Sequence, residues 1–327
     1  MQIVWSSSGN PMSTIEKAVE KLGKKSQKND SAAPTSSSPE VEVDLASAPD
    51  SWEGADTAFE PPATQSANKS IVLPIKELEA KGFVSPYKPR SYIAEEYRAI
   101  KRPLLQNIDT NMAQGTDHAN LIMVTSSFEG EGKTFSAINL MLSISIEKDK
   151  TVLFVDADMA KASAGSLLGI PDDTPGLIDV LEDENIGIED VLLNTDLPNV
   201  RIIPVGVAHE RSTELLASER MKQLMAELSA RYPDRVIIFD SPPFLQTSEA
   251  AVLADCMGQI VFVVEAEKVS PDVVKQAVSR ISDDKIIGML LNKAVRYPWD
   301  NYTHGYGYGY GHSYGAGRTR MGGGQNE

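Results

Sequence analysis

An apolar run that enters a glycine-rich turn constrains the fold of this sequence more than any other feature. Residues Leu121–Ser126 are mostly apolar or β-branched, and the chain then reads Ser-Phe-Glu-Gly-Glu-Gly-Lys-Thr to Thr134. Glycine allows backbone N–H groups to point into such a turn, and a helix that follows it presents a positive N-terminus to the same place. The pattern therefore predicts a strand, loop and helix that hold the phosphates of a nucleotide.

The residues that close this turn have the side chains that a magnesium-bound triphosphate requires. Lys133 is expected to reach the β- and γ-phosphate oxygens, and the Thr134 hydroxyl is expected to bind Mg²⁺. Ser127 occupies a position where the strict pattern has glycine, and Gly130, two residues before Gly132, indicates a variant loop. The residues expected to line the nucleotide are Ser127, Glu129, Gly130, Glu131, Gly132, Lys133, Thr134 and Phe135.

Short apolar runs alternate with longer amphipathic ones between about residues 71 and 295. The expected strands span 120–125, 151–155, 200–204, 235–239, 259–265 and 286–292. The expected helices span 92–106, 134–147, 213–230 and 271–281. Several strands are apolar at nearly every position, as in strands covered on both faces, and the helices between them favour a parallel sheet. The sequence predicts an α/β domain with a doubly wound, mostly parallel sheet flanked by helices, whose ligands bind beyond the carboxyl ends of the strands.

The segments on either side of this domain differ from it in composition. Residues 1–70 are rich in Ser, Pro, Ala and acidic residues, and we expect them to be largely disordered. A short amphipathic helix is expected at 13–22, and Met12 just before it is an alternative start to Met1. Residues 296–327 are rich in Gly and Tyr and are expected to be flexible.

Composition argues against several kinds of function. The net charge of −15 argues against broad nucleic-acid binding, which requires a basic face. Cys256 is the only cysteine and the four histidines show no ligand spacing, so disulfides and zinc clusters are not expected. No run approaches the ~18 apolar residues of a membrane span, and the N-terminus lacks a secretion signal, so we expect a cytoplasmic chain.

Acidic residues end two of the expected strands. Asp156 and Asp158 follow one apolar run, and their i, i+2 spacing points both side chains the same way. Asp240 ends another run, in the position of a Walker-B aspartate. A magnesium–nucleotide site needs carboxylates near the metal, and phosphate transfer to a hydroxyl benefits from one that accepts its proton. The expected catalytic residues are Lys133, Asp156, Asp158 and Asp240, and the expected metal ligands are Thr134, Asp156 and Asp240.

These motifs together resemble a known family. Residues 126–134, Asp156-Ala-Asp158 and Asp240-Ser-Pro-Pro243, followed by a tyrosine-rich tail, are similar to motifs of the bacterial tyrosine kinases. These are P-loop autokinases of capsule and exopolysaccharide synthesis. The resemblance covers roughly residues 85–315, and the start Ser13-Thr-Ile-Glu-Lys-Ala18 is similar to that of the soluble branch associated with exosortase-linked gene clusters.

The resemblance implies an enzyme that uses ATP and Mg²⁺ to phosphorylate its own tyrosines, with Asn292 in contact with the adenine. Asp156 is assigned as the acceptor of the tyrosine proton, with Asp158 and Asp240 nearer the metal. The expected phosphate acceptors are Tyr302, Tyr306, Tyr308, Tyr310 and Tyr314. About fifteen residues beyond Asn292, at ~3.3 Å each, span ~50 Å, so transfer between subunits is geometrically open.

A charged helix upstream is similar to one that, in the family, packs against the next subunit of a ring. Glu95, Arg98 and Lys101 occupy its three charged positions. Their i, i+3 spacing equally suits a ladder of ion pairs within one helix, so both interpretations stay open.

Two positions depart from the patterns of related proteins. Ala160 stands where an arginine usually follows the family's second acidic motif, and Lys161 is the nearest cation that can replace it. Phe128 stands where partition and cell-division ATPases carry a signature lysine, which weakens the resemblance to those ATPases.

We therefore expect a protein-tyrosine autokinase that acts in trans within an oligomer and regulates exopolysaccharide polymerisation and export. The expected partners are further copies of the chain in a ring, a tyrosine phosphatase, and a separate membrane-bound co-polymerase or chain-length determinant. This membrane protein is expected to activate the chain and to recruit it to the inner face of the membrane. Two alternatives stay open. The first is a nucleotide-switched positioning or regulatory ATPase of the partition or septum-site type, whose tail is not a substrate. The second is a catalytically weak structural partner of the co-polymerase.

Overall fold

The computed structural model describes residues 2–5, 69–114, 118–207, 212–231 and 235–294. The chain divides into two units, Met1–Ala294 and Val295–Glu327, and only the first contains described residues. The helix expected at 13–22 and the tail tyrosines lie outside the described residues.

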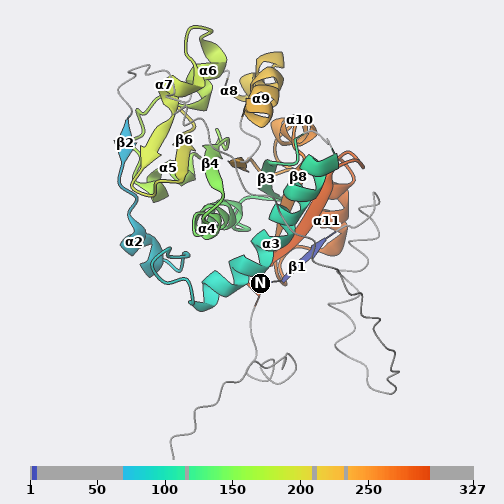
Figure 1. The fold of residues 1–327 in the computed structure, drawn as a ribbon. Coiled ribbons are helices and arrows are strands. Elements are labelled where there is room, and N and C mark those ends of the chain that lie inside the picture. Colours follow the sequence, from blue (N-terminus) through green and yellow to red (C-terminus); the bar gives the residue numbers. More distant parts are fainter. Residues whose placement is uncertain (1, 6–68, 115–117, 208–211, 232–234, 295–327) are drawn as a thin grey trace, which may run out of the picture. The chain divides into compact units, whose positions relative to one another are not determined.

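Within the described residues, nine strands form one sheet in the order β1-β9-β8-β3-β7-β4-β6-β5-β2 (Figure 1). The six predicted strands are present as β3 (Leu121–Ser126), β4 (Thr151–Asp156), β6 (Val200–Ile203), β7 (Arg235–Asp240), β8 (Gln259–Glu265) and β9 (Ile286–Asn292). Three short strands were not predicted: β1 (Gln2–Trp5), in the segment expected to be largely disordered, β2 (Ser70–Ile71) and β5 (Leu193–Thr195). The pairs β1–β9 and β5–β6 are antiparallel and the other pairs are parallel, which confirms the doubly wound α/β class.

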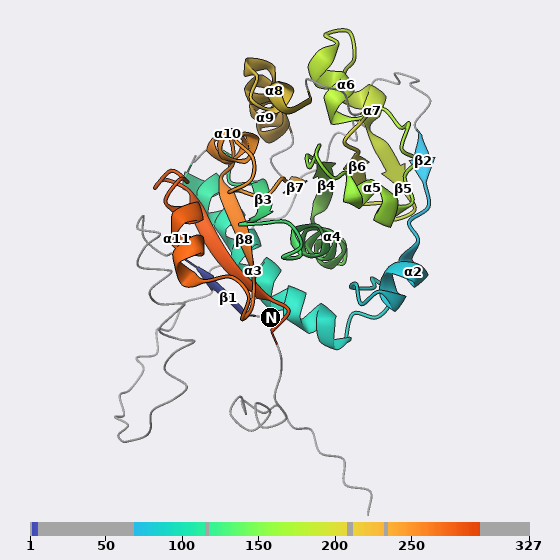
Figure 2. The same cartoon turned by 180° about the vertical axis from the view of Figure 1, so that it is seen from behind.

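Helices cover both faces of the sheet (Figures 1 and 2). One face carries α2 (Ile75–Ala80), α3 (Tyr92–Gln114), α4 (Lys133–Ile144) and α5 (Ser163–Leu168). The other carries α6 (Leu177–Glu182), α7 (Ile188–Val191), α8 (Ser212–Leu216), α9 (Glu219–Arg231), α10 (Glu249–Asp255) and α11 (Pro271–Val278). Alternate residues of the central strands enter opposite cores, as Met123 and Val124 of β3 do. None of the described helices is both long and apolar enough to cross a membrane.

One predicted helix is wrong and the ends of three others change. The single helix expected over 213–230 is two helices, because the Ser218 Oγ accepts a hydrogen bond from the Met221 amide at 3.2 Å and so caps a new helix. The helices expected over 92–106, 134–147 and 271–281 are present as α3, α4 and α11, of which α3 continues through Pro103 to Gln114.

The carboxyl ends of the central strands bring the predicted motifs to one edge of the sheet. Asp156 of β4 lies opposite Asp240 of β7, and Asp240 in turn lies opposite Val124 of β3. Because these strands are parallel, the loop that follows β3 and the two strand-end carboxylates share this edge. The fold therefore places the candidate site where doubly wound sheets bind their ligands.

Candidate active site

The loop between β3 and α4 depends on two glycines and on hydrogen bonds within itself. Gly130 has φ +82° and Gly132 φ +102°, a region that side chains other than glycine rarely adopt. The Ser126 Oγ donates to the Phe128 carbonyl at 2.6 Å, and the Phe128 amide donates to the Glu131 carboxylate at 2.5 Å. The loop ends at Gly132, which caps the N-terminus of α4. Its backbone is therefore shaped before any ligand binds.

Residues at the ends of β8 and β9 hold this loop in place. Glu131 is buried and also accepts a hydrogen bond from the Glu265 amide at 3.2 Å. Burial raises the pKa of Glu131, and the hydrogen bonds from the Phe128 and Glu265 amides partly offset that rise. Asn292, at the end of β9, donates its side-chain amide to the Glu131 carbonyl at 2.8 Å. The predicted adenine-contact residue therefore also fixes the phosphate loop, which sequence reasoning missed.

We predict that Gly132→Ala weakens both folding and nucleotide binding more than Gly130→Ala does. A Cβ at Gly132 would collide with the Asn292 Nδ2, whereas a Cβ at Gly130 meets nothing within 4 Å. Both variants carry the backbone strain of ~1–3 kcal/mol, but only Gly132→Ala must also break the Asn292 hydrogen bond, which adds ~1 kcal/mol. Urea unfolding and ATP titration of the two variants test this, and equal losses would show that Asn292 does not hold the loop.

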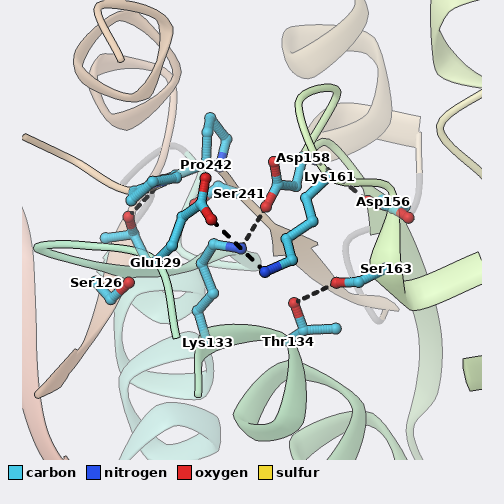
Figure 3. Close-up of polar contacts among 12 residues, drawn as sticks. Ser126, Glu129, Lys133, Thr134, Asp156, Asp158, Lys161, Ser163, Ser241 and Pro242 are labelled. Atoms are coloured by element: carbon cyan, nitrogen blue, oxygen red, sulfur yellow. Dashed lines mark hydrogen bonds and ion pairs between the residues drawn. The ribbon is translucent and has the colours of Figure 1, made fainter. Parts of the chain in front are cut away.

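A buried lysine and three buried aspartates lie at the end of the loop, and Figure 3 shows Lys133 paired with Asp158. The Lys133 ammonium is paired with the Asp158 carboxylate. The Asp158 amide in turn donates to the Asp156 Oδ1 at 3.2 Å. The structure therefore brings the four predicted catalytic residues together: Lys133, Asp156, Asp158 and Asp240.

Burial and mutual repulsion change the protonation of this cluster. Burial, followed by the charge of Asp240, raises the pKa of Asp156 well above its usual range. Burial also raises the pKa of Asp240 to about 7, although the charge of Lys133 acts in the opposite direction. Burial alone would lower the pKa of Lys133, but Asp240 and Asp158 outweigh it and raise that pKa. Lys133 therefore stays charged, while two carboxyl groups have raised proton affinities.

The oxygen atoms of this cluster fit a magnesium ion. Asp156 Oδ2, Asp158 Oδ1 and both carboxylate oxygens of Asp240 are buried without a hydrogen-bond partner. Mg²⁺ prefers oxygen ligands and is usually held by one or two carboxylates together with phosphates and water. Among the described residues, no three His, Cys, Asp or Glu side chains are arranged to hold a metal by themselves. The protein ligands would be strand-end carboxylates and Thr134, whose hydroxyl lies 3.2 Å from that of Ser163.

A second lysine reaches the loop from the segment that follows β4. The Lys161 Nζ lies 3.6 Å from the Glu129 Oε2, and both side chains are about half exposed, at 53% and 52%. Figure 3 shows Lys161 extending across the loop near Lys133. The cation expected to replace the missing arginine is therefore at the phosphate loop.

The structure places the side chains of two predicted site residues against the core. The Phe135 ring stacks at a tilt on Phe83, with 4.6 Å between centroids, and its expected contact with the nucleotide stays a prediction. Lys101 was expected to share a helix face with Glu95 and Arg98, but it is buried and donates to the Ser143 carbonyl at 2.5 Å.

Helix geometry explains the position of Lys101. Glu95 and Arg98 do form an ion pair within α3. Residues six apart are about 120° apart around a helix of ~3.6 residues per turn, so Glu95 and Lys101 cannot lie on one narrow face. Lys101 instead pairs with Glu147 at 2.6 Å, beyond the end of α4.

The fold and the glycine-rich loop define a P-loop type of nucleotide-binding domain. Residues 119–293 match the AAA domain family, a span of more than half of the chain. The chain therefore belongs to the AAA domain family, and the curated proteins that it resembles include several named as tyrosine-protein kinases.

Three comparisons describe this relationship. Tyrosine-protein kinase YwqD of Bacillus subtilis (strain 168) is 26% identical over 215 residues, which cover 65% of this chain and 86% of that protein. Tyrosine-protein kinase wzc of Salmonella typhi is 28% identical over 246 residues, which cover 74% of this chain but 33% of that protein. The crystal structure of the chimerical protein CapA2B2 has a TM-score of 0.55 and 24% identity, covers 68% of this chain and 100% of its own, and shows the fold.

Proposed function

We propose that this chain is an ATP-dependent protein-tyrosine kinase that phosphorylates its own C-terminal tyrosines. The observation that carries the proposal is the set of unpartnered carboxylate oxygens beside the buried Lys133, at the end of a phosphate-binding loop. The kinases named above share this domain, and the sequence supplies acceptors at Tyr302, Tyr306, Tyr308, Tyr310 and Tyr314.

Each residue of the cluster has a different role in phosphate transfer. The tyrosine hydroxyl attacks the γ-phosphorus, the bond from that phosphorus to the bridging oxygen breaks, and ADP leaves. Asp156 accepts the hydroxyl proton, and its raised pKa suits a group that must gain a proton near neutral pH. Lys133 stabilises the charge on the phosphoryl oxygens, and Mg²⁺, when bound, would neutralise further phosphate charge.

Incubating the purified full chain with Mg²⁺ and ATP, and mapping phosphate by mass spectrometry, tests this function. We expect phosphotyrosine among residues 297–314. Release of inorganic phosphate with an unmodified tail would instead support a positioning or regulatory ATPase. ATP binding without any turnover, even beside a membrane-bound co-polymerase, would support a catalytically weak structural partner.

We propose that transfer takes place between subunits of a homo-oligomer. An active chain whose tail tyrosines are all replaced by Phe should phosphorylate a Lys133→Met chain with an intact tail, because neither protein can do so alone. The measurement is phosphotyrosine on the Lys133→Met chain after mixing. Its absence, while the wild-type chain still modifies itself, would show that transfer stays within one subunit.

We propose that this activity regulates exopolysaccharide polymerisation and export. A separate membrane-bound co-polymerase would activate the chain and bring it to the inner face of the membrane, and a tyrosine phosphatase would reverse the modification. Each added phosphate carries ~1.5–2 negative charges, so a modified tail would repel acidic neighbours and alter contacts between subunits.

A further inference from the structure

A small cavity opens at the carboxyl edge of the sheet, on the side of β4 and β6. Its volume is about 200 Å³. Its mostly apolar lining comes from α5, from the segment after α5, and from the segment after β6: Ala162, Gly165, Ile170, Pro171, Val205 and Gly206. A cavity of ~150 Å³ lined by apolar side chains can hold benzene, so this one has room for one aromatic ring.

This cavity adjoins the catalytic cluster. The backbone of Gly165, in the cavity wall, lies near enough to the Asp156 carboxyl group to oppose the rise in its pKa. Ser163, two residues earlier, has its hydroxyl 3.2 Å from that of Thr134 (Figure 3). A chain segment that presents a hydroxyl to Asp156 would therefore pass the mouth of the cavity.

The cavity and Asn292 lie on opposite sides of the phosphate loop. In the sheet, β4 and β6 lie on one side of β3, whereas β8 and β9 lie on the other. If the nucleoside is held near Asn292, as the resemblance implies, the cavity is on the side that the phosphate acceptor must approach.

The proposed acceptor sequence carries a tyrosine at every second residue. Tyr306, Tyr308 and Tyr310 alternate with glycine. In an extended segment, side chains two residues apart point the same way and are ~6.6–7 Å apart. One tyrosine of such a segment can meet Asp156 while the next enters a neighbouring cavity, and the glycine between them adds no side chain that would collide with the rim.

We propose that this cavity binds the ring of a second tyrosine, two residues from the one that reacts, so that the site selects Tyr-Gly-Tyr sequences from another copy of this chain. The inference rests on the proposed kinase function and adds a determinant of its acceptor specificity. It assigns a binding role to residues outside the phosphate loop and the carboxylate cluster.

The lining of the cavity also distinguishes a phosphorylated second tyrosine from an unphosphorylated one. Asp172 contributes to the lining and is exposed, and Thr174 is the other lining residue with a polar side chain. A phosphotyrosine would bring ~1.5–2 negative charges toward this carboxylate and would lose hydration in the cavity. The cavity therefore favours a tyrosine whose neighbour is still unmodified, which would impose an order on successive transfers.

Binding of labelled peptides to the full wild-type chain, with Mg²⁺ and a non-hydrolysable ATP analogue, tests the proposal independently of catalysis. The peptides are Gly-Phe-Gly-Tyr-Gly-Phe-Gly and Gly-Ala-Gly-Tyr-Gly-Ala-Gly, in which Phe retains the ring but cannot be phosphorylated. Burial of one ring should make the Phe peptide bind about tenfold more tightly in fluorescence anisotropy. Equal affinities would overturn the proposal.

Substitution of a residue in the cavity lining provides a second test. Thr174 contributes to the lining and is partly exposed. Thr174→Phe should fill the cavity and reduce the preference for the Phe peptide to within about twofold, whereas Thr174→Val, of similar size, should keep it. Thermal unfolding of both variants shows whether they fold. If Thr174→Phe does not fold, the wild-type peptide comparison alone decides.

The two proposals fail in different ways. A preference for the Phe peptide without phosphate transfer to any tyrosine would contradict the kinase function and leave the cavity as a binding site. Transfer to both peptides at equal rates, with equal affinities, would support the kinase and overturn the cavity proposal.

Discussion

Replacing Lys133 by Met is expected to lower phosphate transfer by about 10²- to 10³-fold, the usual cost of removing one preorganised stabiliser of transition-state charge. The Lys133 ammonium is almost completely buried, and the carboxylates of Asp240 and Asp158 raise its pKa, so it carries a fixed charge at neutral pH. No other described cation occupies the buried cluster. The initial rate of phosphotyrosine formation, measured at saturating ATP, is the readout.

Lys161→Met is the matched control for that result. Lys161 lies beside the same loop, but it is about half exposed and its pair with Glu129 is loose, at 3.6 Å. Exposed ion pairs contribute little, so we expect a loss of about tenfold or less. If Lys161→Met proves as harmful as Lys133→Met, then Lys161 performs the role of the family's missing arginine. If Lys133→Met retains a near wild-type rate, the assignment of Lys133 is wrong.

The parts of the fold that the sequence predicted are those that local patterns determine. The six long strands were recognisable because nearly continuous apolar runs are typical of strands covered on both faces. The strands β2 and β5 have two and three residues, too few for a pattern to emerge. The break at Ser218 was missed because the apolar spacing continues through it, although a serine followed by a helix-forming segment is a capping signal.

The candidate site, like the fold, could be predicted only where local patterns determine it. Lys133 and the three aspartates were found because strand ends and glycine turns have local signatures. The contact of Asn292 with Glu131 joins residues 161 positions apart, and no local pattern encodes it. The burial of Lys101 was missed because its partners lie on another helix, and the outward face of α3 was inferred from spacing alone. The cavity near Asp156 combines segments that only the fold brings together.

Asp240→Asn is expected to remove the loss of stability that Asp240 causes at high pH, and to abolish most activity. Asp240 is fully buried, neither of its oxygens has a hydrogen-bond partner, and burial raises its pKa to about 7 from 3.8. Because the folded-state pKa lies above the unfolded one, this group contributes stability that is present below about pH 4 and is lost as the pH rises through about 7. The difference between the folded and unfolded pKa values corresponds to about 4 kcal/mol of stability at most.

The neutral amide of Asn cannot lose a proton, so the variant should not show that loss. Relative to wild type, we expect Asp240→Asn to be less stable or equal near pH 5 and more stable near pH 8, measured by urea unfolding without nucleotide. Asp149→Asn, which removes an exposed carboxylate, should follow the wild-type curve. Parallel curves for wild type and Asp240→Asn would contradict the burial of an ionisable group in this site.

Unfolding of wild type and Asp240→Asn in the presence of Mg²⁺ and ATP should show whether Asp240 contributes to ligand binding as well as to stability. A ligand that binds only the folded state stabilises it by RT ln(1 + [L]/Kd), so wild type should gain stability from Mg²⁺ and ATP together near pH 8. Asp240→Asn keeps one neutral oxygen in place of the charged carboxylate and should gain little, although it starts from the more stable apo state. Its phosphate transfer should fall by about 10²-fold or more. Equal gains of stability from Mg²⁺ and ATP in both proteins would show that Asp240 is not a ligand of the metal.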